Sequence, residues 1–149
     1  MSGWWSALAE RRAALRPYVT PGELLLCLRI FLYGFAVPTI WRLRPLGLGA
    51  FPARPAPRAS LSEADVERLA ACVETVLWAG RPALQGGCLV RGVTLHHFLM
   101  QGGCDVSLVF GVGRINGELR GHCWLTRRGE PYLEAQDPRR DFVPMHSVP

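Results

Sequence analysis

The chain has 149 residues, 49% of them hydrophobic and 19% charged, with a formal net charge of +5. This composition predicts one domain with a buried core and excludes an intrinsically disordered chain. All 17 basic residues are arginines, which excludes a lysine as base or Schiff-base former. The arginines form no stripe interleaved with aromatic residues, so we expect no nucleic-acid partner.

The cysteine pattern predicts free thiols. The number of cysteines is odd, and no CxxC pair occurs that would indicate a zinc site or a thioredoxin-like motif. They are Cys27, Cys72, Cys88, Cys104 and Cys123. The first residues lack the apolar core of a secretory signal. We therefore expect a cytoplasmic protein with reduced cysteines, no metal and no cofactor.

Residues 20–43 predict the first helix, which opens with the capping-box sequence TPGE. The run that follows is almost wholly apolar. Arg29 within it and the interruption by Pro38 argue against a transmembrane span, which needs about 20 apolar residues. Two interpretations are left: a helix buried in the core or covered by a partner, or peripheral membrane contact through residues 24–43.

Proline and glycine are frequent at 44–59, which predicts an extended linker. The second helix is expected from Ser60, where Glu63 completes a capping box, to Gly80. Its apolar residues recur at helical spacing and are Val66, Leu69, Ala70, Val73, Val76 and Leu77.

The third helix is expected at 88–101, between two pairs of glycines. Its inward side is expected to carry Leu89, Val93, Leu95, His96, Leu99 and Met100, with His97 exposed. Beyond residue 104 the periodicity changes to that of strands, and Asn116-Gly117 is a strong hairpin signal. The expected strands are residues 105–114, 119–128 and 131–136.

Helices followed by an antiparallel meander indicate an α+β fold. We expect an N-terminal helical segment with a Pro-rich linker at 1–59 and a core at 60–149, which together form one compact domain. In that core the helix that starts at Cys88 packs on a small antiparallel sheet.

Cys88 opens the third helix directly after two glycines, although Ser, Thr, Asp or Asn would cap a helix better. The first turn of a helix presents N–H groups without intrahelical acceptors and the positive end of the helix dipole. A thiolate at this position is stabilised, so the pKa of Cys88 should fall toward neutrality. Cys88 is therefore the candidate nucleophile.

Acyl transfer by a cysteine also needs a base and a group that orients the base. His122 is the candidate base, and it shares a strand face with Trp124, whose ring could shield an ion pair from water. Glu134, in the neighbouring strand, is the favoured third member of the triad. Asp137, just past the end of that strand, is the alternative.

Three short motifs follow one another along the chain: Cys88-Leu89-Val90-Arg91, Gly111-Val112 and His122-Cys123-Trp124. In this order and spacing, residues 86–137 resemble the transglutaminase-like cysteine peptidase domain of the lasso-peptide maturation B family, in its standalone form. That family typically shows Cys-Leu-x-Arg at the helix start, Gly-Val after the first strand and His-x-Trp in the next.

The resemblance implies a papain-like or transglutaminase-like fold and removal of the leader from a ribosomally made precursor peptide. A separate ATP-dependent lasso cyclase would then close the ring. Some members carry a winged-helix leader-binding domain, which we do not expect in this chain. The resemblance therefore implies a separate small leader-recognition protein as a partner.

This chain departs from the family pattern at two positions. The third member is usually Asp, whereas Glu134 stands there, and the residue after the histidine is usually small, whereas Cys123 stands there. We expect Cys123 to pack on the face opposite His122. The oxyanion would be held by the Cys88 N–H together with Gln85 or a glycine amide such as that of Gly87.

Arg91, one turn beyond Cys88, is expected either to support the site or to form a surface or structural ion pair. His146 lies in a proline-containing tail and is expected to be solvated. Two other functions fit the same residues. One is a catalytically silent module that presents a peptide, and the other is an acyl transferase in which an amine replaces water.

Overall fold

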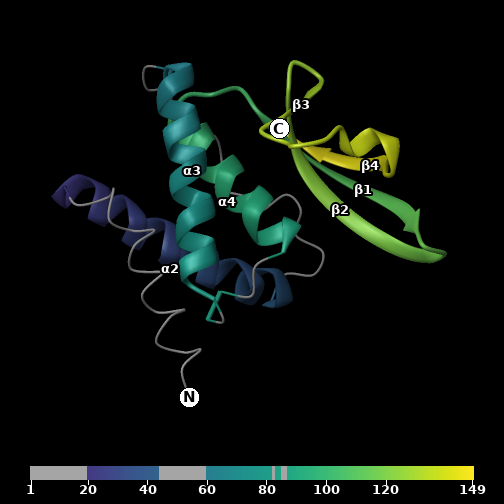
Figure 1. The fold of residues 1–149 in the computed structure, drawn as a ribbon, viewed down its shortest axis with the longest axis horizontal. Coiled ribbons are helices and arrows are strands. Elements are labelled where there is room, and N and C mark those ends of the chain that lie inside the picture. The colour runs from purple at the N-terminus through teal and green to yellow at the C-terminus, as the bar shows by residue number, and fades with distance from the viewer. Residues whose placement is uncertain (1–19, 44–59, 82, 85–86) are drawn as a thin grey trace.

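The computed structural model describes residues 20–43, 60–81, 83–84 and 87–149. The elements in chain order are α2 (Pro21–Leu43), α3 (Glu63–Ala79), α4 (Cys88–Gln101), β1 (Ser107–Ile115), β2 (Glu118–Arg127), β3 (Glu130–Tyr132), η1 (Pro138–Arg140) and β4 (Val143–Val148). The three helices gather on one side and the sheet on the other (Figure 1). The α+β prediction is confirmed, while the predicted linker at 44–59 and Gln85 lie outside the described residues.

The helix starts follow the capping rules. The predicted box at α2 is confirmed, because Thr20 Oγ1 donates to Glu23 Oε2 over 2.7 Å and accepts from the Glu23 N–H. At α3 the predicted cap Ser60 is wrong. Ser62 caps the helix because its extended backbone lets its hydroxyl accept from the Asp65 N–H at 3.2 Å.

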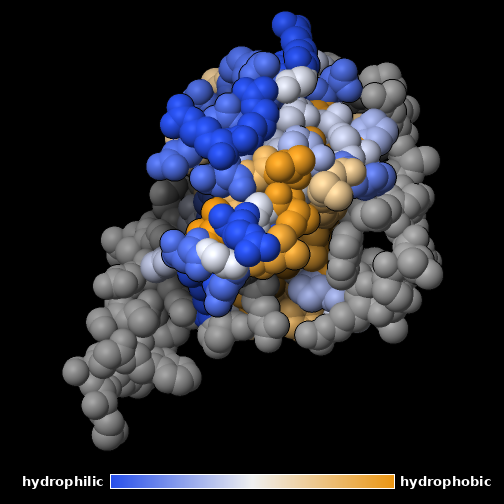
Figure 2. All heavy atoms as spheres, turned by 90° about the vertical axis from the view of Figure 1, so that its right-hand side faces the viewer, coloured by the Kyte–Doolittle hydropathy of each residue, from blue (hydrophilic) through white to orange (hydrophobic). Residues whose placement is uncertain are grey.

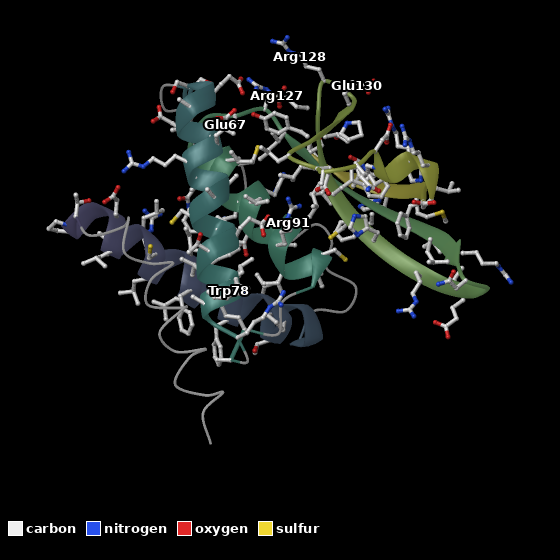
Figure 3. All side chains as sticks on the ribbon, viewed as in Figure 1. Glu67, Trp78, Arg91, Arg127, Arg128 and Glu130 are labelled. Carbon is white, nitrogen blue, oxygen red and sulfur yellow. The ribbon has the colours of Figure 1, made fainter. Side chains whose placement is uncertain are left out.

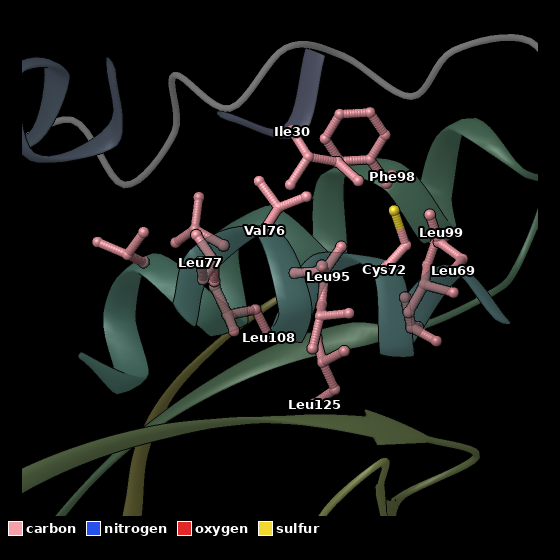
Figure 4. Close-up of a cluster of buried hydrophobic side chains, with 14 of the residues drawn as sticks. Ile30, Leu69, Cys72, Val76, Leu77, Leu95, Phe98, Leu99, Leu108 and Leu125 are labelled. Carbon is pink, nitrogen blue, oxygen red and sulfur yellow. The ribbon is translucent and has the colours of Figure 1, made fainter. Parts of the chain in front are cut away.

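α4 is the central element of the core. It packs against α2 and α3 on one side and against β1 and β2 on the other. It is therefore buried around most of its circumference, and the predicted one-sided stripe was too narrow. Leu89 and Met100 are only half-buried. The core beneath it draws on all three helices and on both long strands (Figure 4). The buried residues of α4 are Val90, Gly92, Val93, Thr94, Leu95, His96, Phe98 and Leu99.

Gly92 sets how closely α4 approaches the sheet. A methyl group at this position would lie 3.0 Å from Leu108 Cδ1 and 3.2 Å from Cys123 Sγ. Both distances are shorter than ordinary carbon contacts. The absence of a side chain at Gly92 therefore lets the first turns of α4 rest directly on β2.

The sheet is antiparallel with strand order β3-β2-β1-β4. Two-residue turns at Asn116-Gly117 and Arg128-Gly129 join its first three strands, and all four turn residues have φ between 52° and 84°. These values are typical of type I′ hairpins. The predicted third strand was too long, because only Glu130–Tyr132 pairs with β2.

The strand β4 was not predicted. Its residues are mostly exposed and include Pro144, so its sequence lacks the apolar alternation of a half-buried strand. It nevertheless pairs with β1 along the open edge of the hairpin. His146, expected in a solvated tail, is exposed but lies in this strand beside the Phe110 ring.

α2 has two different faces. Ile30 and Val37 are buried in the core, while large apolar side chains on the other face are 52–58% exposed, namely Leu24, Leu25, Leu28, Leu32 and Phe35. By length and composition alone Pro21–Thr39 could cross a membrane, a test that core helices of soluble proteins also pass. One face of α2 thus packs in the core, and the other exposes large apolar side chains.

Candidate active site

Cys88 is the first residue of α4 and is half-buried. Gly87 is the N-cap, in an extended conformation, and no side chain caps the helix. The thiol therefore occupies the place where the positive end of the helix dipole is not offset by a capping group. The predicted start of this helix at Cys88 is thus the observed one.

Two consecutive residues of β2 surround the Cys88 thiol. The pKa of the Cys88 thiol is lowered to about 5, and the hydrogen bond from the Cys123 thiol is the largest cause. The Cys123 N–H and the hydrogen bond and positive charge of His122 act in the same direction, while partial burial opposes them. The same hydrogen bond, together with burial, raises the pKa of Cys123. Cys123 therefore stays protonated and donates to the Cys88 thiolate.

Cys123 lies at the site, although it was not among the residues predicted there. It points to the opposite face from His122, as expected, and is 2% exposed. That face carries α4, so Cys123 lies under the start of the helix and touches the thiol. The available signal was its position beside the candidate base, where the resembled family has a small residue.

His122 lies between two aromatic rings. Its ring centroid is 5.9 Å from that of Trp124, with the planes 21° apart, and 5.0 Å from that of Phe142. Trp124 is 1% exposed and lies beside His122, as expected from their shared strand face. Phe142 was not predicted, and it reaches the site because the segment before β4 crosses this face of the sheet.

Arg91 joins three parts of the molecule (Figure 3). Its guanidinium donates to Glu74 Oε1 on α3 at 2.5 Å, to Glu134 Oε1 at 2.7 Å and to the Leu133 carbonyl at 2.7 Å. The structural ion pair was one of the two expectations for Arg91. It fixes the segment after β3 to α4.

The two candidate acids differ in their surroundings. Glu134 is bound by Arg91 of α4, and its negative charge helps to raise the pKa of Cys123. Asp137 caps η1 and binds the Arg139 side chain, which lowers the pKa of Asp137. Within the described residues, the hydrogen bonds of neither acid go to His122.

The remaining histidines lie away from the thiol. His96 is 6% exposed, as predicted, and burial lowers its pKa. The prediction that His97 is exposed was wrong, because α2 covers it. Its ring stacks on Tyr33 at 4.1 Å and bonds to Gln101 at 2.8 Å. In the part of the chain that the structure describes, no three His, Cys, Asp or Glu side chains are grouped to hold a metal ion.

Alkylation of Cys88 by iodoacetamide should reach half its maximal rate near pH 5 and change little from about pH 6 to 8, because the thiolate forms above the pKa. Burial raises the pKa values of Cys72 and Cys104, so their alkylation should be slow throughout. Mass spectrometry of the labelled peptides measures each rate. In Cys123→Ala the midpoint for Cys88 should move to higher pH, whereas an unchanged midpoint would contradict the assigned hydrogen bond.

Gly111→Ala should destabilise the fold and disturb Trp124. A methyl group at Gly111 would lie 2.7 Å from two ring carbons of Trp124 and 2.9 Å from the Val143 carbonyl oxygen. We expect a loss of about 1–3 kcal/mol in the free energy of unfolding, as for other overpacked sites. Gly121→Ala is the control, because its methyl group would meet nothing closer than 4.0 Å. Equal urea midpoints for the two variants would contradict this packing.

Comparison with known proteins gives one result. A family model described as the transglutaminase-like superfamily matches residues 30–147. No curated protein and no solved structure matches the chain significantly. The matched residues include the whole site and most of the described part of α2.

Proposed function

The chain belongs to the transglutaminase-like superfamily, and on this premise we propose that it is a cysteine peptidase that removes the leader from a ribosomally made precursor peptide. One observation carries the proposal: a helix-start thiol with a pKa of about 5 lies against His122 of β2. The superfamily supports chemistry of the cysteine peptidase or acyltransferase type. The motifs shared with the lasso-peptide maturation B family support the leader as the part removed.

The proposed reaction starts from the Cys88 thiolate. Its sulfur attacks the scissile carbonyl carbon, and the carbonyl oxygen takes the negative charge beside the N–H groups at the start of α4. His122 gives its proton to the leaving amine as the C–N bond breaks, which leaves a thioester on Cys88. Water, deprotonated by His122, then attacks the thioester. This step releases the peptide as a carboxylic acid and restores the Cys88 thiolate beside protonated His122.

The partners follow from the same proposal. A separate small recognition protein would bind the leader, and an ATP-dependent cyclase would use the cleaved peptide in the cytoplasm. The exposed face of α2 is a candidate surface for that recognition protein or for peripheral membrane contact. Its five exposed apolar side chains support such a role.

A cleavage assay tests the function. The protein is mixed with the precursor peptide encoded beside its gene, with and without the small recognition protein, and the products are weighed by mass spectrometry. We expect one cleavage between leader and core, faster with the recognition protein. Prior alkylation of Cys88 at pH 6 should abolish it. An intact precursor in every mixture would contradict the proposal.

Two further functions are separated by the same assay. An acyl transferase is favoured by the superfamily, and it would give a product whose mass includes an added amine rather than water. A silent peptide-binding module is favoured by the lack of a carboxylate bonded to His122 among the described residues. It would bind the precursor without cleaving it.

Glu134→Gln should lower the rate of cleavage by at least about tenfold, whereas Asp137→Asn should leave it within about twofold. We propose Glu134 as the third triad member, because Arg91 holds its carboxylate against the helix that starts at Cys88, while Asp137 is bound to Arg139. The measurement is kcat/KM with the precursor, beside a melting curve for each variant. A larger loss for Asp137→Asn would transfer the role to Asp137.

A further inference from the structure

One edge of β2 is only partly paired. β3 pairs with β2 at Leu125, Thr126 and Arg127 alone. In the described residues no strand covers the same edge from Glu118 to Trp124. This stretch is the outer side of the hairpin that projects from the helices (Figure 1).

The turns fix which residues face that edge. In a two-residue hairpin the residues that flank the turn form a hydrogen-bonded pair, and bonding alternates along the strand. Glu118 flanks one turn and pairs with Ile115, so even-numbered residues of β2 bond to β1. Arg127 flanks the other turn and pairs with Glu130, so odd-numbered residues direct their N–H and C=O toward the β3 side.

The open edge leads to the nucleophile. The Cys123 N–H faces this edge and bonds to the Cys88 thiol. The next backbone groups on the edge are those of Gly121 and Leu119, at intervals of two residues, or about 6.8 Å. This interval is the one at which an extended peptide presents its own N–H and C=O groups.

The edge is open to solvent as well as to pairing. Residues 118–121 are all exposed, and a methyl group at Gly121 would meet nothing closer than 4.0 Å. Leu119 is 73% exposed. The side of the molecule that carries the hairpin shows apolar surface bordered by hydrophilic residues (Figure 2). An extended peptide could therefore reach the edge and place an apolar side chain on Leu119.

We infer that the substrate is an extended peptide that adds as a strand to the edge of β2, pairs with Gly121 and Leu119, and places an apolar side chain against Leu119. This inference rests on the proposed function and names the form in which the substrate is bound. Main-chain pairing supplies affinity, and the alternate side-chain positions supply specificity. The bound peptide strand would bring its scissile carbonyl to Cys88. The residues that pair must therefore be extended, and none of them can be proline where an N–H has to donate.

A peptide aldehyde tests the inference without the precursor. Acetyl-Leu-Val-Phe-aldehyde forms a reversible hemithioacetal, in which the Cys88 sulfur bonds to the aldehyde carbon and the aldehyde oxygen takes up the proton. Its protection of Cys88 against iodoacetamide measures affinity. Three isomers each carry one N-methyl group, on the first, second or third amide. In a paired strand, only alternate N–H groups face the edge of β2. Either the middle amide or the two flanking amides should therefore tolerate a methyl group, and methylation of the others should weaken binding.

We expect a difference of about tenfold in affinity between the blocked and the tolerated amides, the scale of one lost hydrogen bond. Leu119→Asp should also weaken protection by about tenfold. Val143→Asp is the matched control, because Val143 is 65% exposed but lies on β4 at the far edge of the sheet. It should change protection by less than about twofold.

The outcomes separate this inference from the proposed function. Equal effects of all three methyl groups, equal effects of the two Asp variants, or no protection by the unmethylated aldehyde would overturn strand addition. Cleavage of the precursor that depends on Cys88 would still uphold the peptidase. Alternating protection with an uncleaved precursor would uphold the edge and overturn leader removal.

Discussion

Replacing Cys88 with alanine is expected to lower the rate of precursor cleavage by at least about a thousandfold. The thiol is half-buried at the start of α4, and its pKa of about 5 keeps it ionised at neutral pH. No other side chain in the described site offers a nucleophile at this position, because Cys123 is held protonated. The measurement is a single-turnover time course followed by mass spectrometry.

Cys27→Ala is the control for this loss. Cys27 is also half-buried, but its thiol lies 3.6 Å from that of Cys72, between α2 and α3. Its replacement should leave cleavage within about twofold, since it removes no group near His122. Cleavage by Cys88→Ala at the wild-type rate would show that another group performs the reaction and would end the case for a cysteine peptidase.

Much of the fold could be predicted because the strongest signals are local. The TPGE sequence caps α2, and Asn116-Gly117 closes the hairpin, in both cases through groups within four residues. The errors arose where two nearby residues fitted the same local pattern, or where an element had no local pattern of its own. Ser62 replaced Ser60 as the cap of α3. The strand β4 depends on pairing with β1 and not on its own apolar alternation.

The candidate site was predicted in part for the same reason. Cys88 was identified by an anomalous helix start, and the stacking of His122 on Trp124 follows from alternation along one strand. Cys123 was assigned to the correct face, but its contact with the thiol depends on how closely α4 approaches at Gly92. That distance is a tertiary property.

Arg91→Met is expected to lower the free energy of unfolding by about 2–3 kcal/mol, somewhat less than the loss of a fully buried ion pair. The variant keeps an apolar stem and loses the guanidinium that binds Glu74, Glu134 and the Leu133 carbonyl. The Glu134 side chain is 13% exposed, so its carboxylate would be left nearly buried without its cation. Urea unfolding measures the loss.

Arg120→Met is the matched control. Arg120 pairs with Glu118 on the projecting hairpin, where both side chains are more than 60% exposed, at 62% and 69%. Its loss should change stability by no more than about 0.5 kcal/mol, as is usual for exposed pairs. Because Arg91 also holds the segment of Glu134, Arg91→Met should lower kcat at temperatures where the variant is still folded. Equal stability losses for the two variants would mean that Arg91 does not join the nucleophile helix to the acid-bearing segment.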